Sequence, residues 1–206
     1  MKILLAFYLG LSLLAFAHAE DKSSALRKRV TDFCQTEFKG DDDGRATYLE
    51  DSVKEKYVVD FRVEPVDVVT SFQIVSIDIK GDLANVIVTY DVIGQFRNVS
   101  YSGYPNLKKP EAIPFKRADR FLAVHMPQFR QRSTWKLDHS DGQWYLVHSG
   151  IPKVSRDGLL EVIQKEITLE SEIIRKDPTP HTPSEYCRMW NEEKVKALEA
   201  LQTEQK

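Results

Sequence analysis

The chain has 206 residues, of which 42% are hydrophobic, and a formal net charge of −2 at pH 7. This length is enough for one domain with a real core plus an appendage, and the composition excludes a disordered chain. The small net charge gives no electrostatic reason to expect a nucleic-acid partner.

Residues 1–19 have the pattern of a secretory signal. Lys2 supplies a basic start, residues 3–16 are apolar, and Ala17-His18-Ala19 is a small-x-small cleavage site. The apolar run is short for a membrane span, and no second run of that kind follows. We therefore predict an exported protein, periplasmic or secreted, whose mature part starts at Glu20 and has no transmembrane segment. An uncleaved anchor is the alternative.

The two cysteines, Cys34 and Cys187, both lie in the mature part. In an oxidising compartment, two cysteines far apart in sequence predict a single disulfide, which would tie the tail to the first helix. The alternative is one buried thiol and one exposed thiol.

Two helices are predicted near the start of the mature chain. The first ends at Gly40 and carries an apolar stripe with steps of three and four residues: Leu26, Val30, Phe33, Cys34 and Phe38. The second runs from Arg45 to about residue 57. Between them, Asp41-Asp42-Asp43-Gly44 is either part of a calcium loop or a turn that caps the second helix, and its spacing does not match an EF-hand.

A β-hairpin is predicted over residues 72–92, with its turn at Gly81-Asp82, after a short strand at residues 58–63. The expected pairs are Ile79 with Ala84, Ile77 with Val86, Val75 with Val88 and Gln73 with Tyr90 on one face; Asp78 with Asn85, Ser76 with Ile87 and Phe72 with Asp91 lie on the other.

Residues 95–131 are irregular and rich in proline, with a possible strand from Phe121 to Val124. Aromatic residues alternate there with basic ones, which include Arg97, Lys108, Lys109, Lys116, Arg117, Arg120 and Arg130. We expect this basic segment, from Arg97 to Arg132, to contact an anionic ligand, an acidic partner or a phosphate-rich surface. The alternative is a solvated insertion whose aromatic rings pack on the sheet.

A second hairpin is predicted over residues 133–149, because Asp141-Gly142 is a pair favoured in a type I′ turn. That turn would place Leu137 opposite Leu146 and Trp135 opposite His148. An amphipathic helix to about Lys176, a proline-rich linker and a further helix from Ser184 complete the chain.

These elements resemble the nuclear transport factor 2-like superfamily over roughly residues 26–149. The second hairpin has the form W-x-L-x(4)-G-x-W, made by Trp135, Leu137, Gly142 and Trp144. The first hairpin carries a second motif, which consists of its turn and the alternate residues that follow: Gly81, Asp82, Ala84, Val86, Val88 and Tyr90. The helices after Gly150 and the basic segment depart from that family's pattern.

The resemblance implies an α+β fold, in which a curved antiparallel sheet wraps around the N-terminal helices like a cone and leaves a cavity. It divides the chain into a domain at residues 20–152 and a helical extension at residues 153–206. The superfamily includes isomerases, dehydratases, ligand-binding modules and assembly domains, so the fold does not select a function.

His148, beside Trp135 in the expected register, is the candidate general base, with Asp91 as a nearby carboxylate. A structural histidine is the alternative. Tyr90 and Trp135 are expected to border the cavity and contact a ligand. The histidines show no ligand spacing, so we expect no metal and no cofactor.

These observations favour an exported, non-catalytic module that binds a small ligand in the cavity or a protein partner. One alternative is a small cavity enzyme of the isomerase or dehydratase type that uses His148. Another is a subunit of an envelope assembly, with its tail helix buried in another chain. A dimer is compatible with each of them.

Overall fold

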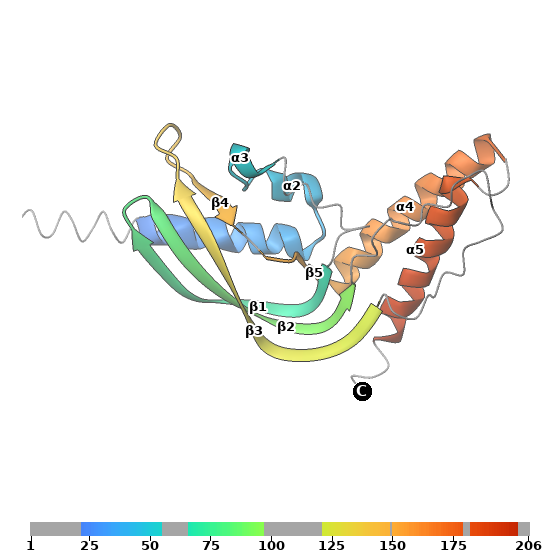
Figure 1. The fold of residues 1–206 in the computed structure, drawn as a ribbon, viewed down its shortest axis with the longest axis horizontal. Coiled ribbons are helices and arrows are strands. Elements are labelled where there is room, and N and C mark those ends of the chain that lie inside the picture. Colours follow the sequence, from blue (N-terminus) through green and yellow to red (C-terminus); the bar gives the residue numbers. More distant parts are fainter. Residues whose placement is uncertain (1–21, 55–65, 97–120, 149, 179–181, 202–206) are drawn as a thin grey trace, which may run out of the picture.

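The computed structural model describes residues 22–54, 66–96, 121–148, 150–178 and 182–201. They form an α+β fold in which a five-stranded sheet curves around the first helix (Figure 1). The strand order is β4-β3-β2-β1-β5, with β1 (Val66–Lys80), β2 (Leu83–Phe96), β3 (Phe121–Leu137), β4 (Trp144–His148) and β5 (Lys153–Ser155). The predicted fold class is confirmed, but the sheet is mixed, because β5 pairs parallel to β1.

The N-terminal helix (residues 22–38) lies against the concave face of the sheet. Leu26, Val30 and Phe33 are buried there in the main core, together with side chains of β1 to β4. The helix ends at Gly40, whose positive φ of 73° suits a residue without a Cβ. The predicted apolar stripe is thus the face that packs on the sheet.

The second predicted helix is wrong in its extent. Instead there are two short helices, α2 (Asp42–Ala46) and α3 (Asp51–Lys54). The chain between them leaves the helical path because Leu49 pairs with Leu146 of β4, and backbone hydrogen bonds join this segment to that strand. Asp41 caps α2 by accepting a hydrogen bond from the Gly44 N–H, as the alternative to calcium predicted.

The first hairpin forms at the predicted turn, but its register holds only near that turn. Ile79 faces Ala84 and Ile77 faces Val86, as expected, whereas Phe72 faces Tyr90 rather than Asp91. A bulge between Ile74 and Ser76 leaves Val75 unpaired and exposed. Because the bulge shifts the alternation by one residue, Phe72 rather than Gln73 packs against the core. The predicted pairs of Val75 and Gln73 were therefore wrong.

The second hairpin has a longer loop than predicted, so its register is also shifted. Trp135 faces Leu146, and His148 faces Thr134 rather than Trp135. The loop is closed by side chains, since Asp138 accepts a hydrogen bond from the Ser140 N–H and Asp141 accepts one from the Gln143 N–H. This register buries both tryptophans of the hairpin on the concave side.

Two C-terminal helices, α4 (Arg156–Lys176) and α5 (Pro183–Ala200), pack side by side at one end of the sheet (Figure 1). A second core joins them to the sheet; it contains Val66, Val68, Ile93, Val154, Leu159, Ile163, Leu198 and Leu201. The tail helix therefore folds back on its own chain. Residues 153–155 belong to the sheet, although the predicted extension begins at residue 153.

Several predictions fall wholly or partly on residues outside the described ranges. Among them are the signal at residues 1–19, the end of the second predicted helix, the strand at residues 58–63 and most of the basic segment. The predicted strand at Phe121–Val124 is confirmed as the start of β3. Within the described ranges, none of the helices has both the length and the apolar character that crossing a membrane requires.

Candidate functional site

Four charged side chains are buried together near the end of the N-terminal helix. Glu37 comes from that helix, Arg45 from α2, Asp67 from β1 and Lys153 from β5, and each side chain is at most 3% exposed. We call these four residues the buried charge cluster. Charged residues are almost never buried to this extent unless they are paired, so their arrangement decides what the cluster can do.

Glu37 and Arg45 form the first pair. The Arg45 Nε donates a hydrogen bond to Glu37 Oε1 at 3.0 Å, and the guanidinium lies 6.0 Å from the centre of the Phe33 ring. Burial raises the pKa of the Glu37 carboxyl, and the nearby positive charges of Arg45 and Lys153 oppose that rise without cancelling it. Glu37 therefore holds a proton more readily than an exposed glutamate does.

Asp67 and Lys153 form the second pair, across the parallel junction of β1 and β5. The Lys153 Nζ lies 2.8 Å from Asp67 Oδ2, and the Gln95 amide donates to Asp67 Oδ1 at 2.9 Å. Lys153 also donates to the Ile151 carbonyl. Both charges are thus surrounded by partners from their own chain, and the cluster carries two positive and two negative groups.

A thiol and a phenol adjoin the cluster. Cys34 Sγ lies 3.6 Å from Tyr90 Oη. Burial, helped by the negative charge of Glu37, raises the pKa of the Cys34 thiol to about 12, and burial raises the pKa of Tyr90 well above its usual range. A thiol that stays protonated at neutral pH is a poor nucleophile, so Cys34 acts as a packing residue.

The structure shows no disulfide bond between Cys34 and Cys187, so the predicted bridge is not present in it. Cys34 is buried between the N-terminal helix and the sheet, whereas Cys187 lies on α5, in the helix pair beyond the sheet. The two side chains belong to separate parts of the fold; Cys34 is buried, as the alternative predicted, whereas Cys187 is half-buried rather than exposed.

The two candidate catalytic residues do not meet inside the curved sheet. His148 is exposed at the end of β4, opposite Thr134, so its expected place beside Trp135 was wrong. The Asp91 carboxylate accepts hydrogen bonds from Ser71 Oγ at 2.8 Å and from the Gln128 N–H at 2.9 Å. The Gln128 N–H, followed by the Ser71 hydroxyl, holds the pKa of Asp91 below its usual value.

The role of Asp91 is explained by a bulge in β3. Pro127 and Gln128 stand opposite Asp91 alone, and Gln128 has a positive φ of 54°. The bulge turns the Gln128 N–H away from the backbone hydrogen bonds between the strands, and this N–H donates a hydrogen bond to the Asp91 carboxylate instead. Asp91 thus stabilises a strained bend, which accounts for its position without any catalytic role.

Tyr90 and Trp135, the residues expected to contact a ligand, are buried in the main core. The Trp135 ring packs edge-on against Phe33 at 5.6 Å between ring centres, and its Nε1–H donates to Ser133 Oγ. The predicted contacts Arg97, Lys108, Lys109, Lys116, Arg117 and Arg120 lie outside the described residues. Arg130 and Arg132 of the same basic segment are exposed on β3.

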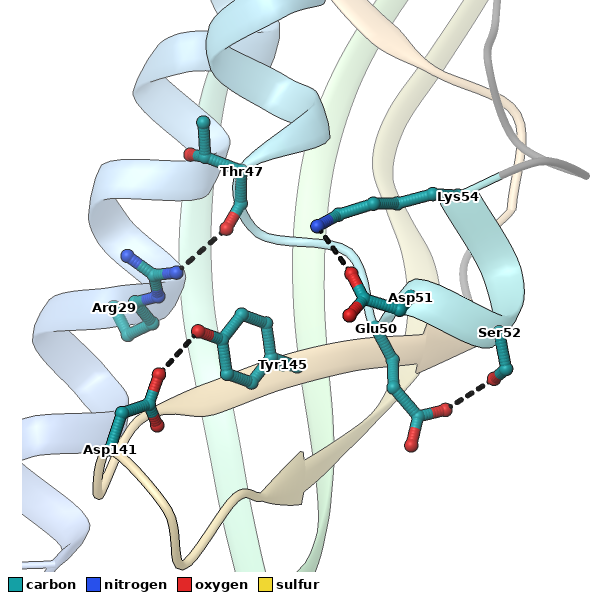
Figure 2. A network of polar contacts seen from close by, with 8 residues as sticks. All are labelled: Arg29, Thr47, Glu50, Asp51, Ser52, Lys54, Asp141 and Tyr145. Atoms are coloured by element: carbon teal, nitrogen blue, oxygen red, sulfur yellow. Dashed lines mark hydrogen bonds and ion pairs between the residues drawn. The ribbon is translucent and has the colours of Figure 1, made fainter.

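A polar network around Arg29 covers the outer edge of β4, and Figure 2 shows part of it. The guanidinium lies 4.2 Å from the centre of the Tyr48 ring and 5.6 Å from that of Tyr145, and it donates to the Thr47 carbonyl at 2.9 Å. Tyr145 in turn donates to Asp141 at 2.6 Å. These contacts fasten the N-terminal helix to the second hairpin, so we assign the network a structural role.

The buried charge cluster was not predicted from the sequence, although a signal for it was present. Glu37 lies four residues after Phe33, on the apolar stripe of its helix, and Asp67 interrupts the run Val66-Asp67-Val68-Val69. A charge inside an apolar pattern indicates a buried, paired group. No local pattern, however, showed that Asp67 would meet Lys153.

The cluster presents paired charges rather than an open set of ligands. Within the part of the chain that the structure describes, no three or more His, Cys, Asp and Glu side chains are placed to hold a metal ion. No family model matches the sequence, and no curated protein matches it either.

Proposed function

We propose that this chain is an exported, non-catalytic module that binds an acidic protein partner through its exterior. The observation that carries the proposal is the pairing inside the buried charge cluster. Because Glu37 pairs with Arg45 and Asp67 with Lys153, the four charges of the cluster are already engaged with one another inside the fold.

The packing of the concave side supports the same choice over a small ligand or a cavity enzyme. Tyr90 and Trp135 fill the space between the N-terminal helix and the sheet. The enzyme alternative depended on His148, which is exposed, and on Asp91, whose carboxylate is engaged by the bulge of β3. Partner binding on the outside requires neither residue.

The basic segment is the surface that we assign to the partner. Its described end presents Arg130 and Arg132 to solvent on β3, on the face opposite the buried Ser133 and Trp135. Two exposed guanidinium groups on a strand suit carboxylates on another protein, which they can bind with two parallel hydrogen bonds each.

The proposal can be tested by native mass spectrometry of the protein purified from the exported fraction of its own host. The variant Arg130→Glu/Arg132→Glu is compared with Arg27→Glu/Lys28→Glu, a matched charge reversal at two exposed residues of the N-terminal helix. We expect the wild type and the control to carry one additional protein that is released on denaturation, and the β3 variant to lose it.

Other outcomes would overturn the proposal. A bound small molecule in place of a protein would favour the ligand-binding alternative. A chain that carries nothing, or a partner retained equally by both variants, would exclude the basic segment as its binding surface.

A further inference from the structure

We propose that two copies of this chain associate through α4, with the two α4 helices antiparallel across a two-fold axis. This inference is independent of the partner proposed for the basic segment, because it concerns another surface and a second copy of the same chain.

The first observation is an apolar pair on the outside of α4. Leu169 is 51% exposed and Ile173 is 43% exposed, and the two lie one helical turn apart on one face. Four other apolar residues of this helix, Leu159, Leu160, Ile163 and Ile167, pack inward on the second core. Leu169 and Ile173 therefore form a distinct outward face.

The second observation is the position of this face. Figure 1 shows α4 and α5 rising together away from the end of the sheet. The sheet end of α4 is tightly held, since a Cβ at Gly158 would lie 2.7 Å from the carbonyl oxygens of Phe38 and Lys39. Leu169 and Ile173 lie beyond that contact, on a two-helix arm. The α4 helix of a second copy, laid against this face, would bury it.

The third observation is charge complementarity around the apolar pair. Glu166 and Lys176 lie on the same face of α4, because residues 166, 169, 173 and 176 follow one another by steps of three and four. Glu166 is half-buried and also interacts within its own chain, whereas Lys176 is exposed. The face thus has an acidic end, an apolar centre and a basic end.

This order of groups is complementary to itself only in the antiparallel direction. Each Leu169 would meet the partner's Ile173, and each Glu166 would meet the partner's Lys176, about 7.5 Å along the helix from the two-fold axis. A parallel pair would instead place Glu166 beside Glu166 and Lys176 beside Lys176. Because one helix per copy makes the contact, we expect a dissociation constant on the order of micromolar.

The apolar contact is tested by sedimentation velocity of the full chain over a wide concentration range. Leu169→Gln/Ile173→Gln is compared with Met189→Gln, a substitution at an exposed apolar residue of α5 outside this face. We expect the wild type and Met189→Gln to dimerise alike, and the double variant to raise the dissociation constant at least about tenfold. A wild type that stays monomeric throughout, or equal losses in both variants, would overturn the proposal.

The direction of pairing is tested by charge reversal. Lys176→Glu alone should weaken the dimer, and Glu166→Lys alone should do the same. An equimolar mixture of the two variants should associate, because every cross-pair then joins opposite charges. Circular dichroism establishes whether each variant is folded. If Glu166→Lys does not fold, Lys176→Glu by itself remains decisive. A folded Lys176→Glu protein that dimerises like the wild type would refute the antiparallel arrangement.

Discussion

Removing the Lys153 ammonium should destabilise the fold strongly. In Lys153→Met, the Asp67 carboxylate would stay buried, at 3% exposure, with the Gln95 amide as its remaining side-chain hydrogen-bond donor among the described residues. Breaking a buried pair in this way costs about 3–5 kcal/mol, because one charge is left uncompensated. Typical domains have about 5–15 kcal/mol of stability in all, so the loss would be a large part of the total.

The measurement is urea unfolding followed by tryptophan fluorescence, since Trp135 and Trp144 are both buried. Lys165→Met is the control, because Lys165 pairs with Glu161 at 2.7 Å while both side chains are largely exposed. It should change the free energy of unfolding by no more than about 0.5 kcal/mol.

A second variant separates the effect of charge from that of packing. Lys153→Met/Asp67→Asn removes both charges but keeps an acceptor for the Gln95 amide, so it should recover at least half of the loss. The reasoning would be refuted if Lys153→Met cost no more than Lys165→Met, or if the double variant were as unstable as the single one.

The remaining predictions concern a titration, a close contact and a bulge. Burial raises the pKa of Glu37, so the stability that this group contributes is present below pH about 4.5 and is lost as the pH rises through the folded-state pKa. Urea unfolding at several pH values should therefore show the wild type losing stability relative to Glu37→Gln over that window. A stability difference that does not change with pH would contradict this. Gly158→Ala should destabilise the fold by about 1–3 kcal/mol in thermal or urea unfolding, because the new Cβ would press on the Lys39 carbonyl. Replacing a glycine by alanine in a helix with open space around it would instead stabilise the fold. The Asp91 carboxyl should titrate below 3.8 by NMR, and Ser71→Ala should raise that pKa; a midpoint at or above 3.8 in the wild type would count against the bulge contact.

The fold class and the first hairpin turn were predictable because they depend on local patterns. Alternation around Gly81-Asp82 fixes the turn, and the pairs nearest to it, Ile79 with Ala84 and Ile77 with Val86, follow directly. The bulge at Val75 was not predictable in this way. Which residue of a strand is left unpaired depends on which side chains the N-terminal helix can bury. The residues of that helix are distant from the hairpin in the sequence.

The predicted register of the second hairpin was wrong for a different reason. Asp141-Gly142 favours a two-residue turn, but Asp138 and Asp141 also cap backbone N–H groups inside a longer loop. Both solutions satisfy the local residues, and burial of Trp135 opposite Leu146 distinguishes them. Leu137 faces Trp144 instead of Leu146, a shift of two residues, and a further irregularity between Thr134 and Trp135 places the candidate base His148 opposite Thr134 and at the surface.

The buried charge cluster shows the same division between local and distant information. The sequence identifies Glu37 and Asp67 as charges inside apolar patterns, which predicts burial and pairing. It cannot supply their partners, because the Asp67 pair depends on a parallel contact between β1 and β5. Long-range strand pairing of this kind has no signature at either strand alone.

The pairing of β5 with β1 also makes a later segment of the chain a condition for completing a much earlier strand. Until Lys153 has been synthesised, β1 has an open edge of unpaired backbone groups and Asp67 has no counter-ion. An open edge can pair with a strand of another molecule, so shortened chains would aggregate or be degraded rather than accumulate. The three residues of β5 thus protect the edge of a strand five times as long as themselves.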